Sequence, residues 1–351
     1  MKLTEKSLKR GLVFSVVCGA ISILLVSSLT KTKLDWAGLG RISSTYFALA
    51  VALAIASWLA KTFRIQFLIS AMGEKISTGR MLNIFLSACF VSHVTPMTGG
   101  GMPLQIYMLY RQGVNFGHTV AVSVVDSFLT ALFYILAALL LLFVWHSPIR
   151  LSSGMVMFAL GLIILACAFL LYLILKPEAV GSLTVKIGGS GFFRFLNRKG
   201  RLERWTVRVS QEVRRYREAL SLLSQNRCSA LWLAFAWTLV YWALYLAIVP
   251  MLLAGLNVSF DLVQVMESQL LLNFIQPFFP TPGASGGAEL TFAFFFRNVV
   301  PKGLLGIFVM AWRLATYYLS LICGAVAIVY ALRRGWLERN QFETATKKEQ
   351  Q

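Results

Sequence analysis

The chain has 351 residues, of which 58% are hydrophobic and 13% are charged. Soluble domains are usually about 45–50% apolar and about 25% charged, and a single soluble core rarely grows beyond about 250–300 residues. The composition therefore excludes an ordinary soluble enzyme, a disordered chain, a coiled coil and a disulfide scaffold. Because the apolar runs are long and do not alternate as barrel strands do, we expect an all-α integral membrane protein.

Basic residues outnumber acidic residues by 33 to 14, which gives a formal net charge of +19. Such an excess is typical of nucleic-acid-binding proteins and of the cytoplasmic loops of membrane proteins, and the hydrophobic composition favours the second class. We therefore expect no nucleic-acid partner. The five cysteines are scattered in or beside apolar runs without metal-ligand spacing, so we expect no metal site and no cofactor.

Six uncharged runs approach the roughly 20 residues that a helix needs to cross a bilayer. They are Gly11–Thr30, Ile42–Ala60, Ser127–Trp145, Leu151–Leu175, Cys228–Phe260 and Leu314–Leu332. The third run extends back to about Thr119 if Asp126 is tolerated, and the sixth extends back to about Leu304 if Arg313 is tolerated. The fifth run leaves room for a connector after Pro250. The first run could be a signal peptide, but its length favours a spanning helix.

Two further apolar stretches, Met81–Tyr110 and Leu262–Phe296, are interrupted by proline and glycine. Both residues break helices, so each stretch should form two half-length pieces. We expect two re-entrant helical hairpins, at about 81–111 and 262–297, which membranes tolerate only inside protein or facing water. Two alternatives stay open: each hairpin counts as two crossings, or the Gly/Pro-rich segments are loops between ordinary helices.

The distribution of Lys and Arg predicts that both termini are cytoplasmic. We expect a first membrane unit over residues 1–175, a basic cytoplasmic segment over 176–227, a second membrane unit over 228–334 and a cytoplasmic tail over 335–351. Within the basic segment, Leu202–Leu223 has the spacing of an amphipathic helix lying on anionic lipid. The outward placement of Lys31, Lys33 and Arg41 runs against this orientation.

The two interrupted stretches share a motif. Thr95-Pro96 followed by Gly100-Gly101 aligns with Thr281-Pro282 followed by Gly286-Gly287, and the same offset aligns Arg111 with Arg297. Under the charge-based topology the two units are inverted relative to each other. Inverted repeats with broken helices are typical of transporters in which the substrate binds between the repeats.

These motifs resemble the signature of the lysylphosphatidylglycerol synthase transmembrane-region family, which is also called flippase-like. The resemblance covers roughly Leu12 to Arg334 and is carried by Thr281–Glu289 and by Thr95–Gln105 with the following Arg111. It implies a membrane domain similar to a lipid flippase, in the bacterial cytoplasmic (inner) membrane, with a homodimer as an option. We expect this chain to lack the soluble aminoacyltransferase domain and to act as a transporter rather than an enzyme.

Ionisable residues at membrane depth and the N-termini of half-helices are the candidate substrate-binding groups. Arg313 is expected to bind phosphate, or else to pair with Glu289 or Glu267. Glu289 and Asp126 could each counter a cationic headgroup, carry a proton or pair with an arginine. The full candidate set is Thr95, Gly99, Gly100, Gly101, Arg111, Asp126, Asn273, Gln276, Thr281, Ser285, Gly286, Gly287, Glu289, Arg297 and Arg313.

The function expected from these features is a phospholipid or polyprenyl-lipid flippase or scramblase. Its partners would be membrane phospholipids, aminoacylated or anionic lipids, or polyprenyl phosphates. The chain has no Walker A motif, so direct use of ATP is not expected. The alternative is an ion-coupled secondary transporter of a small anion. A lipid-modifying enzyme with Ser285 as nucleophile is less favoured.

Overall fold

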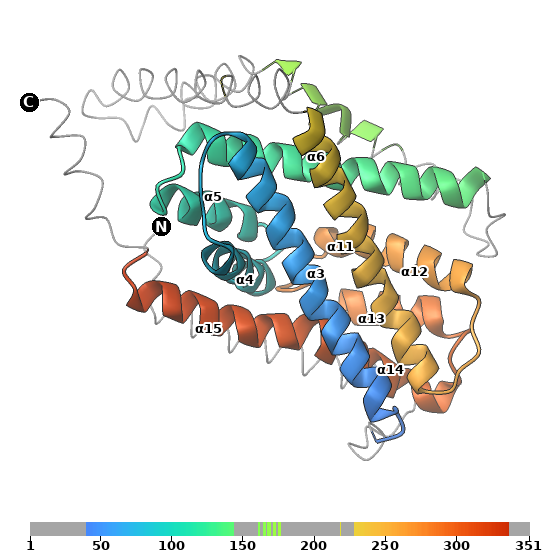
Figure 1. The fold of residues 1–351 in the computed structure, drawn as a ribbon. Helices are drawn as coiled ribbons and strands as arrows, with labels where there is room; N and C mark the ends of the chain where they lie inside the picture. The colour runs from blue at the N-terminus through green and yellow to red at the C-terminus, as the bar shows by residue number, and fades with distance from the viewer. Residues whose placement is uncertain are drawn as a thin grey trace, which may run out of the picture.

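The structure, a computed structural model, describes residues 40–143 and 228–336, together with 161, 164–165, 167–169, 171–172, 175–176 and 218. Every regular element within these residues is a helix (Figure 1). The predicted first span, most of the fourth span, nearly all of the basic segment with its amphipathic helix, and the C-terminal tail lie outside the described residues.

Four helices in the described part are long and apolar enough to cross a membrane. They are α3 (Ser44–Ala71), α6 (Phe116–Phe143), α11 (Cys228–Gly255) and a continuous helix made of α14 (Lys302–Arg313), η2 (Leu314–Tyr318) and α15 (Leu319–Arg333). They correspond to four of the six predicted spans. The protein is therefore an all-helical, multi-pass membrane protein.

Two of these helices are longer than the sequence predicted. Helix α3 continues past Ala60 through Lys61 and Arg64, because both cations are paired with Asp126 of α6 and do not enter the membrane as bare charges. Helix α11 continues through Pro250 instead of ending there as a connector. Proline lacks the N–H that would bond the carbonyl four residues back, which here belongs to Leu246.

Both interrupted stretches are broken helices, as predicted. The first consists of α4 (Thr78–Val94) and α5 (Gly101–Arg111), and the second consists of α12 (Leu262–Ile275), the short η1 (Gln276–Phe278) and α13 (Gly287–Phe296). Each piece is shorter than the roughly 20 residues of a full crossing. Helix α4 packs against α5 and α12 packs against α13, so each stretch folds back on itself.

The repeat extends beyond the two motifs. The offset that aligns the motifs carries Gly101, the first residue of α5, to Gly287, the first residue of α13. It also carries Phe116, where α6 begins, to Lys302, where α14 begins. Helices α3 and α11 begin within two residues of equivalent positions. The order long helix, broken pair, long helix thus occurs twice.

The backbone at the two breaks is also alike. Met97 and Thr98 have positive φ angles of 54° and 52°, and the equivalent Gly283 and Ala284 have angles of 59° and 56°. Positive φ is costly for residues with a Cβ, so two unrelated loops would rarely share it at matching positions. The two breaks therefore share this pair of positive φ angles, although the equivalent Gly100 and Gly286 differ, with φ angles of −83° and 90°.

The two units run in opposite directions. The backbone N–H of Ser43, just before α3, donates to the carbonyl of Gly255 at the end of α11 over 2.9 Å. Towards the other end of the pair, Arg64 Nη1 donates to Thr238 Oγ1 over 3.0 Å. Helices α3 and α11 are therefore antiparallel, and they lie side by side through the centre of the molecule, between α4 and α5 on one side and α12 and α13 on the other (Figure 1).

The two breaks meet each other. Pro96 and Pro282, which are equivalent in the repeat, form an antiparallel β-bridge. An antiparallel contact between equivalent residues is what a local two-fold axis through that contact produces. The breaks, although far apart in sequence, thus form one structure between the two oppositely directed units.

Candidate functional site

Threonine hydroxyls hold the turn at each break. Thr95 Oγ1 accepts from the N–H of Gly100 over 3.0 Å and donates to the carbonyl of Val91 over 2.7 Å. Thr281 Oγ1 donates to the carbonyl of Ser285 over 2.8 Å. Both threonines were predicted to bind substrate, and the contacts described for them are within their own turns.

Glycines at the breaks allow close packing of the helices that follow. A Cβ on Gly101 would lie 2.8 Å from the carbonyl oxygen of Ala88, and a Cβ on Gly287 would overlap the ring of Phe279. Gly100 is similarly crowded, whereas Gly99 is exposed and meets nothing closer than 3.7 Å. Three of these four glycines thus have a packing role.

A buried ion pair lies beside the second break. Arg313 Nε is 2.9 Å from Glu289 Oε1, and each side chain is 1% exposed. The other carboxylate oxygen of Glu289 accepts from the N–H of Gly286 over 2.7 Å. Glu289 therefore both caps the N-terminus of α13 and neutralises the charge of Arg313. Of the predicted roles for these two residues, the ion pair is the one that the structure contains.

Tyr317 joins the ion pair to both breaks. Its ring lies under the Arg313 guanidinium at 4.8 Å and 4.8 Å from the ring of His93. It also fills the space that a Cβ on Gly283 would need. His93 Nε2 in turn lies 2.8 Å from Ser320 Oγ, a hydrogen bond of the kind expected for a hairpin histidine.

The backbone at this point is unusual. Tyr317 lies in η2, a π-helical turn that begins directly after Arg313, and such turns are frequent at functional sites. Arg313 Nη2 is buried and has no hydrogen-bond partner among the described residues. One buried donor at the meeting point of the breaks is therefore still able to bind an acceptor.

The remaining residues predicted around the second break are spread out. Asn273 Nδ2 donates to the carbonyl of Gln269 over 2.8 Å, and Gln276 is half-buried at the start of η1. Arg297 is exposed and lies over the ring of Phe294 at 4.3 Å. Arg297 is therefore not part of the buried cluster, and a long basic side chain at a helix end is suited to extend to the membrane interface.

Arg111 of the first unit and Ser285, the candidate nucleophile, each have a buried polar atom without a described partner. Arg111 is half-buried at the end of α5, and its Nε has no hydrogen-bond partner in the described part of the chain. Ser285 is buried, and no described residue accepts from or donates to its Oγ. In residues 40–143 and 228–336 we find no group of three His, Cys, Asp or Glu that could hold a metal.

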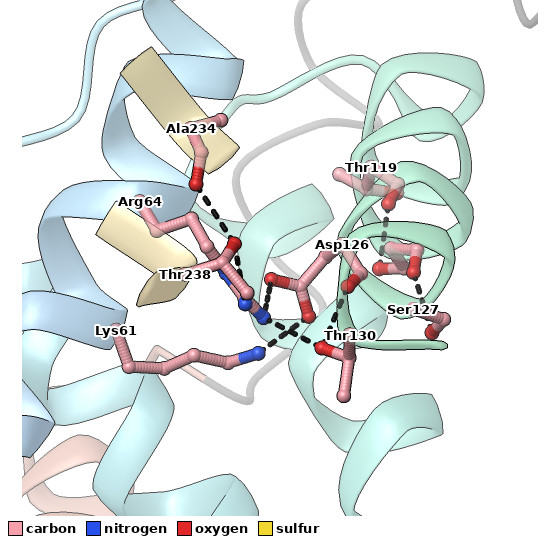
Figure 2. Close-up of polar contacts among 9 residues, drawn as sticks. Lys61, Arg64, Thr119, Asp126, Ser127, Thr130, Ala234 and Thr238 are labelled. Carbon is pink, nitrogen blue, oxygen red and sulfur yellow. Dashed lines mark hydrogen bonds and ion pairs between the residues drawn. The ribbon is translucent and has the colours of Figure 1, made fainter. Parts of the chain in front are cut away.

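A second buried cluster of charges lies between α3, α6 and α11 (Figure 2). Asp126 pairs with Arg64 through Oδ1 and with Lys61 through Oδ2, the second pair over 2.6 Å. The Arg64 side chain is 0% exposed, against 16% for Lys61 and 11% for Asp126. Of the roles predicted for Asp126, pairing with an arginine is the one found, and that arginine is Arg64.

Sequence reasoning missed Lys61 and Arg64. The expected span ended at Ala60, the last residue of an uncharged run, so the two cations were left outside it. Their spacing of three places both on one face of a helix, and a lone carboxylate, Asp126, stands inside another apolar segment. Opposite charges buried in two spans were the signal that could have found this pair.

The comparison with known proteins covers all of these features. The model of a family described as the lysylphosphatidylglycerol synthase TM region matches residues 12–324. A UPF0104 membrane protein of Archaeoglobus fulgidus is 26% identical over 333 residues, which are 94% of this chain and 99% of that protein. The family match includes both breaks and both charge clusters. Because it spans most of the chain, this protein belongs to the lysylphosphatidylglycerol synthase TM region family.

Proposed function

We propose that this protein moves lipids between the two leaflets of a membrane, as a flippase or scramblase for phospholipids or polyprenyl lipids. The observation that carries the proposal is the meeting of two equivalent helix breaks, from oppositely directed units, beside the buried Arg313–Glu289 pair. The family name, which refers to the membrane region of a phospholipid synthase, agrees with a lipid substrate.

A lipid headgroup needs what these breaks offer. An isolated charge at the bilayer centre costs at least about 2.5–3.5 kcal/mol, so a carrier must supply polar groups at that depth. The N-termini of α5 and α13 begin at the two breaks, and free N–H groups and the helix dipole attract phosphate there. Two half-helices that end inside the membrane would bring these groups to the headgroup while the acyl chains stay in lipid.

The two units also support transport by alternating access. Helix α4 packs along α15, with Asn83 Nδ2 donating to the carbonyl of Ala327 over 3.0 Å. The equivalent helices α12 and α6 meet much less extensively within the described residues, where Met266 and Leu270 of α12 share one apolar cluster with Tyr134 of α6. Equivalent interfaces in different states are expected of an inverted repeat that opens to one side at a time.

The proposed function includes a location and an orientation of the protein in the membrane. We place the protein in the cytoplasmic membrane of a bacterium with both termini inside, on the charge distribution of the sequence. The chain acts as a transporter, with membrane lipids as its partners and a homodimer as its oligomeric state.

The test is reconstitution into vesicles that carry a fluorescent phospholipid in both leaflets. The protein should let an external reductant bleach label that began in the inner leaflet, whereas vesicles without protein keep it. Removing one member of a buried pair costs about 3–5 kcal/mol, so single variants risk unfolding. The informative variant is Glu289→Gln with Arg313→Met, which removes both charges together.

We expect the double variant to fold and to lose translocation. The matched control is Lys302→Met, which removes an exposed cation at the start of the same helix. Normal translocation by the double variant would assign Arg313 and Glu289 a purely structural role. If the wild-type protein moves no anionic, zwitterionic or polyprenyl lipid, the proposed function is wrong, and uptake of a small anion by the same vesicles would favour the alternative transporter.

A further inference from the structure

The charged cluster formed by Lys61, Arg64 and Asp126 has a net charge of +1 when all three side chains are ionised. Lys61 and Arg64 contribute two cations, and Asp126 is the one carboxylate that pairs with either of them among the described residues. The pair at Arg313 is different, because one arginine there meets one glutamate. Buried charges are normally balanced, so an unbalanced cation at membrane depth indicates a site for an anion.

The excess charge can be assigned to Lys61. Arg64 is fixed, since its two terminal nitrogens donate to Thr238 over 3.0 Å and to Thr130 over 3.2 Å. Each threonine hydroxyl is itself oriented by donating to the carbonyl four residues back in its own helix. The charge of Arg64 alone balances that of Asp126, so Lys61, which also bonds to Asp126 Oδ2, brings the excess positive charge that another anion can neutralise.

Lys61 is also the accessible member. Its side chain is 16% exposed, whereas the Arg64 side chain is fully buried. Figure 2 shows both cations reaching from α3 towards Asp126, with Thr238 of α11 closing the cluster beside Arg64. Tyr241 lies 5.9 Å from Lys61 Nζ and 6.0 Å from the Arg64 guanidinium, so an aromatic ring faces both cations.

A second observation points to an oxygen-rich ligand. Arg64 Nε is buried and has no hydrogen-bond partner in the described residues. The ammonium of Lys61 has three donors, of which one bonds to Asp126 Oδ2. A phosphate group offers several acceptor oxygens together with the negative charge that the cluster lacks.

We infer that Lys61, supported by Arg64 and Asp126, binds the phosphate group of a lipid whose headgroup has a net negative charge. This inference rests on the proposed function, because a lipid substrate is what brings a phosphate to this depth. Binding of such a headgroup brings the net charge of the site to zero. A zwitterionic or aminoacylated headgroup adds its own cation beside Lys61 and is disfavoured.

The experiment measures binding in detergent, without transport. Short-chain phosphatidylglycerol, short-chain phosphatidylcholine and inorganic phosphate are titrated separately, and the change in tryptophan fluorescence is followed. The test variant is Lys61→Gln, which folds because Asp126 keeps Arg64 as its partner. Lys61→Arg restores the charge, and Lys75→Gln removes an exposed cation outside the cluster.

We expect the wild-type protein to bind phosphatidylglycerol at least about tenfold more tightly than phosphatidylcholine, since both lipids offer a phosphate but the choline of the second lipid places a further cation beside Lys61. Lys61→Gln should lose that preference, and Lys61→Arg and Lys75→Gln should keep it. Equal binding of the two lipids, or an unchanged preference in Lys61→Gln, would overturn the inference. Binding of inorganic phosphate alone would overturn the assignment to a lipid. Lys61-dependent lipid binding without translocation in vesicles would support the site and reject the proposed function.

Discussion

Gln269 replaces a backbone donor that Pro250 cannot supply. Its Nε2 donates to the carbonyl of Leu246 over 2.9 Å, and this carbonyl is the one that the N–H of residue 250 would bond in a regular helix. The side chain of Gln269 is buried, so it donates to the Leu246 carbonyl away from bulk water. Helix α11 thus continues through a proline because α12 provides the missing hydrogen bond.

We predict that Gln269→Leu destabilises the protein by about 1–3 kcal/mol, because the Leu246 carbonyl becomes a buried acceptor without a donor. Thermal unfolding in detergent measures this change. In a Pro250→Ala background the restored N–H takes over the carbonyl, and Gln269→Leu should cost much less. Equal costs in the two backgrounds would mean that Gln269 does not act through Pro250.

The two buried charge clusters have different net charges. Arg313 was predicted to bind phosphate or to pair with Glu289 or Glu267, and its charge is balanced by Glu289. The excess positive charge is assigned to Lys61, which lies one residue past the predicted end of the span at Ala60, on a helix that continues to Ala71. Buried charges are therefore better assessed as sets than as single residues, and the sets become visible only after folding.

The breaks in α4–α5 and α12–α13 are the elements that the sequence predicted best. Proline and glycine act locally, so the ends of the four pieces could be expected from the positions of these residues alone. The continuation of α3 past Ala60 could not, because it depends on Asp126 of another helix. The bridge between Pro96 and Pro282 is likewise a long-range contact. The sequence repeat showed that these two prolines are equivalent, but it did not predict that they touch.

Close packing at the first break depends on Gly101. A Cβ there would lie 2.8 Å from the Ala88 carbonyl oxygen, which belongs to the backbone of α4 and cannot turn away. We predict that Gly101→Ala destabilises the protein by about 1–3 kcal/mol through overpacking. Unfolding in detergent, followed by the loss of helical circular dichroism, measures it.

The matched control is Gly79→Ala, in the first turn of α4, where a Cβ would meet nothing within 4 Å. There alanine should be neutral or stabilising by about 0.5–1 kcal/mol, because glycine costs more backbone entropy in a helix. A Gly101→Ala variant that is as stable as Gly79→Ala would show that the break tolerates a Cβ and that its packing has been misjudged.

At the scale of the whole molecule, the two units are alike in chain path and unlike in packing. The α4–α15 interface is closed by the Asn83–Ala327 and His93–Ser320 hydrogen bonds, whereas α12 and α6 meet mainly through a few side chains in the described residues. Asn83 has Gln269 as its repeat equivalent, and that amide bonds to α11 instead of to α6. If the α4–α15 interface took the loose packing of α12 and α6, and α12 and α6 packed as closely as α4 and α15 do now, one side of the molecule would open and the other would close.

The most direct measurement is therefore translocation by protein whose closed interface is held shut. Cysteines at positions 83 and 327, in a chain otherwise free of cysteine, are joined by a short thiol-specific reagent that light cleaves, so the reductant of the assay leaves the link intact. In vesicles with labelled lipid, we predict no translocation while α4 and α15 are linked, and full recovery after cleavage. The two single-cysteine variants, treated in the same way, should translocate throughout. Translocation at the same rate before and after cleavage would contradict alternating access, and none in either state would contradict lipid transport.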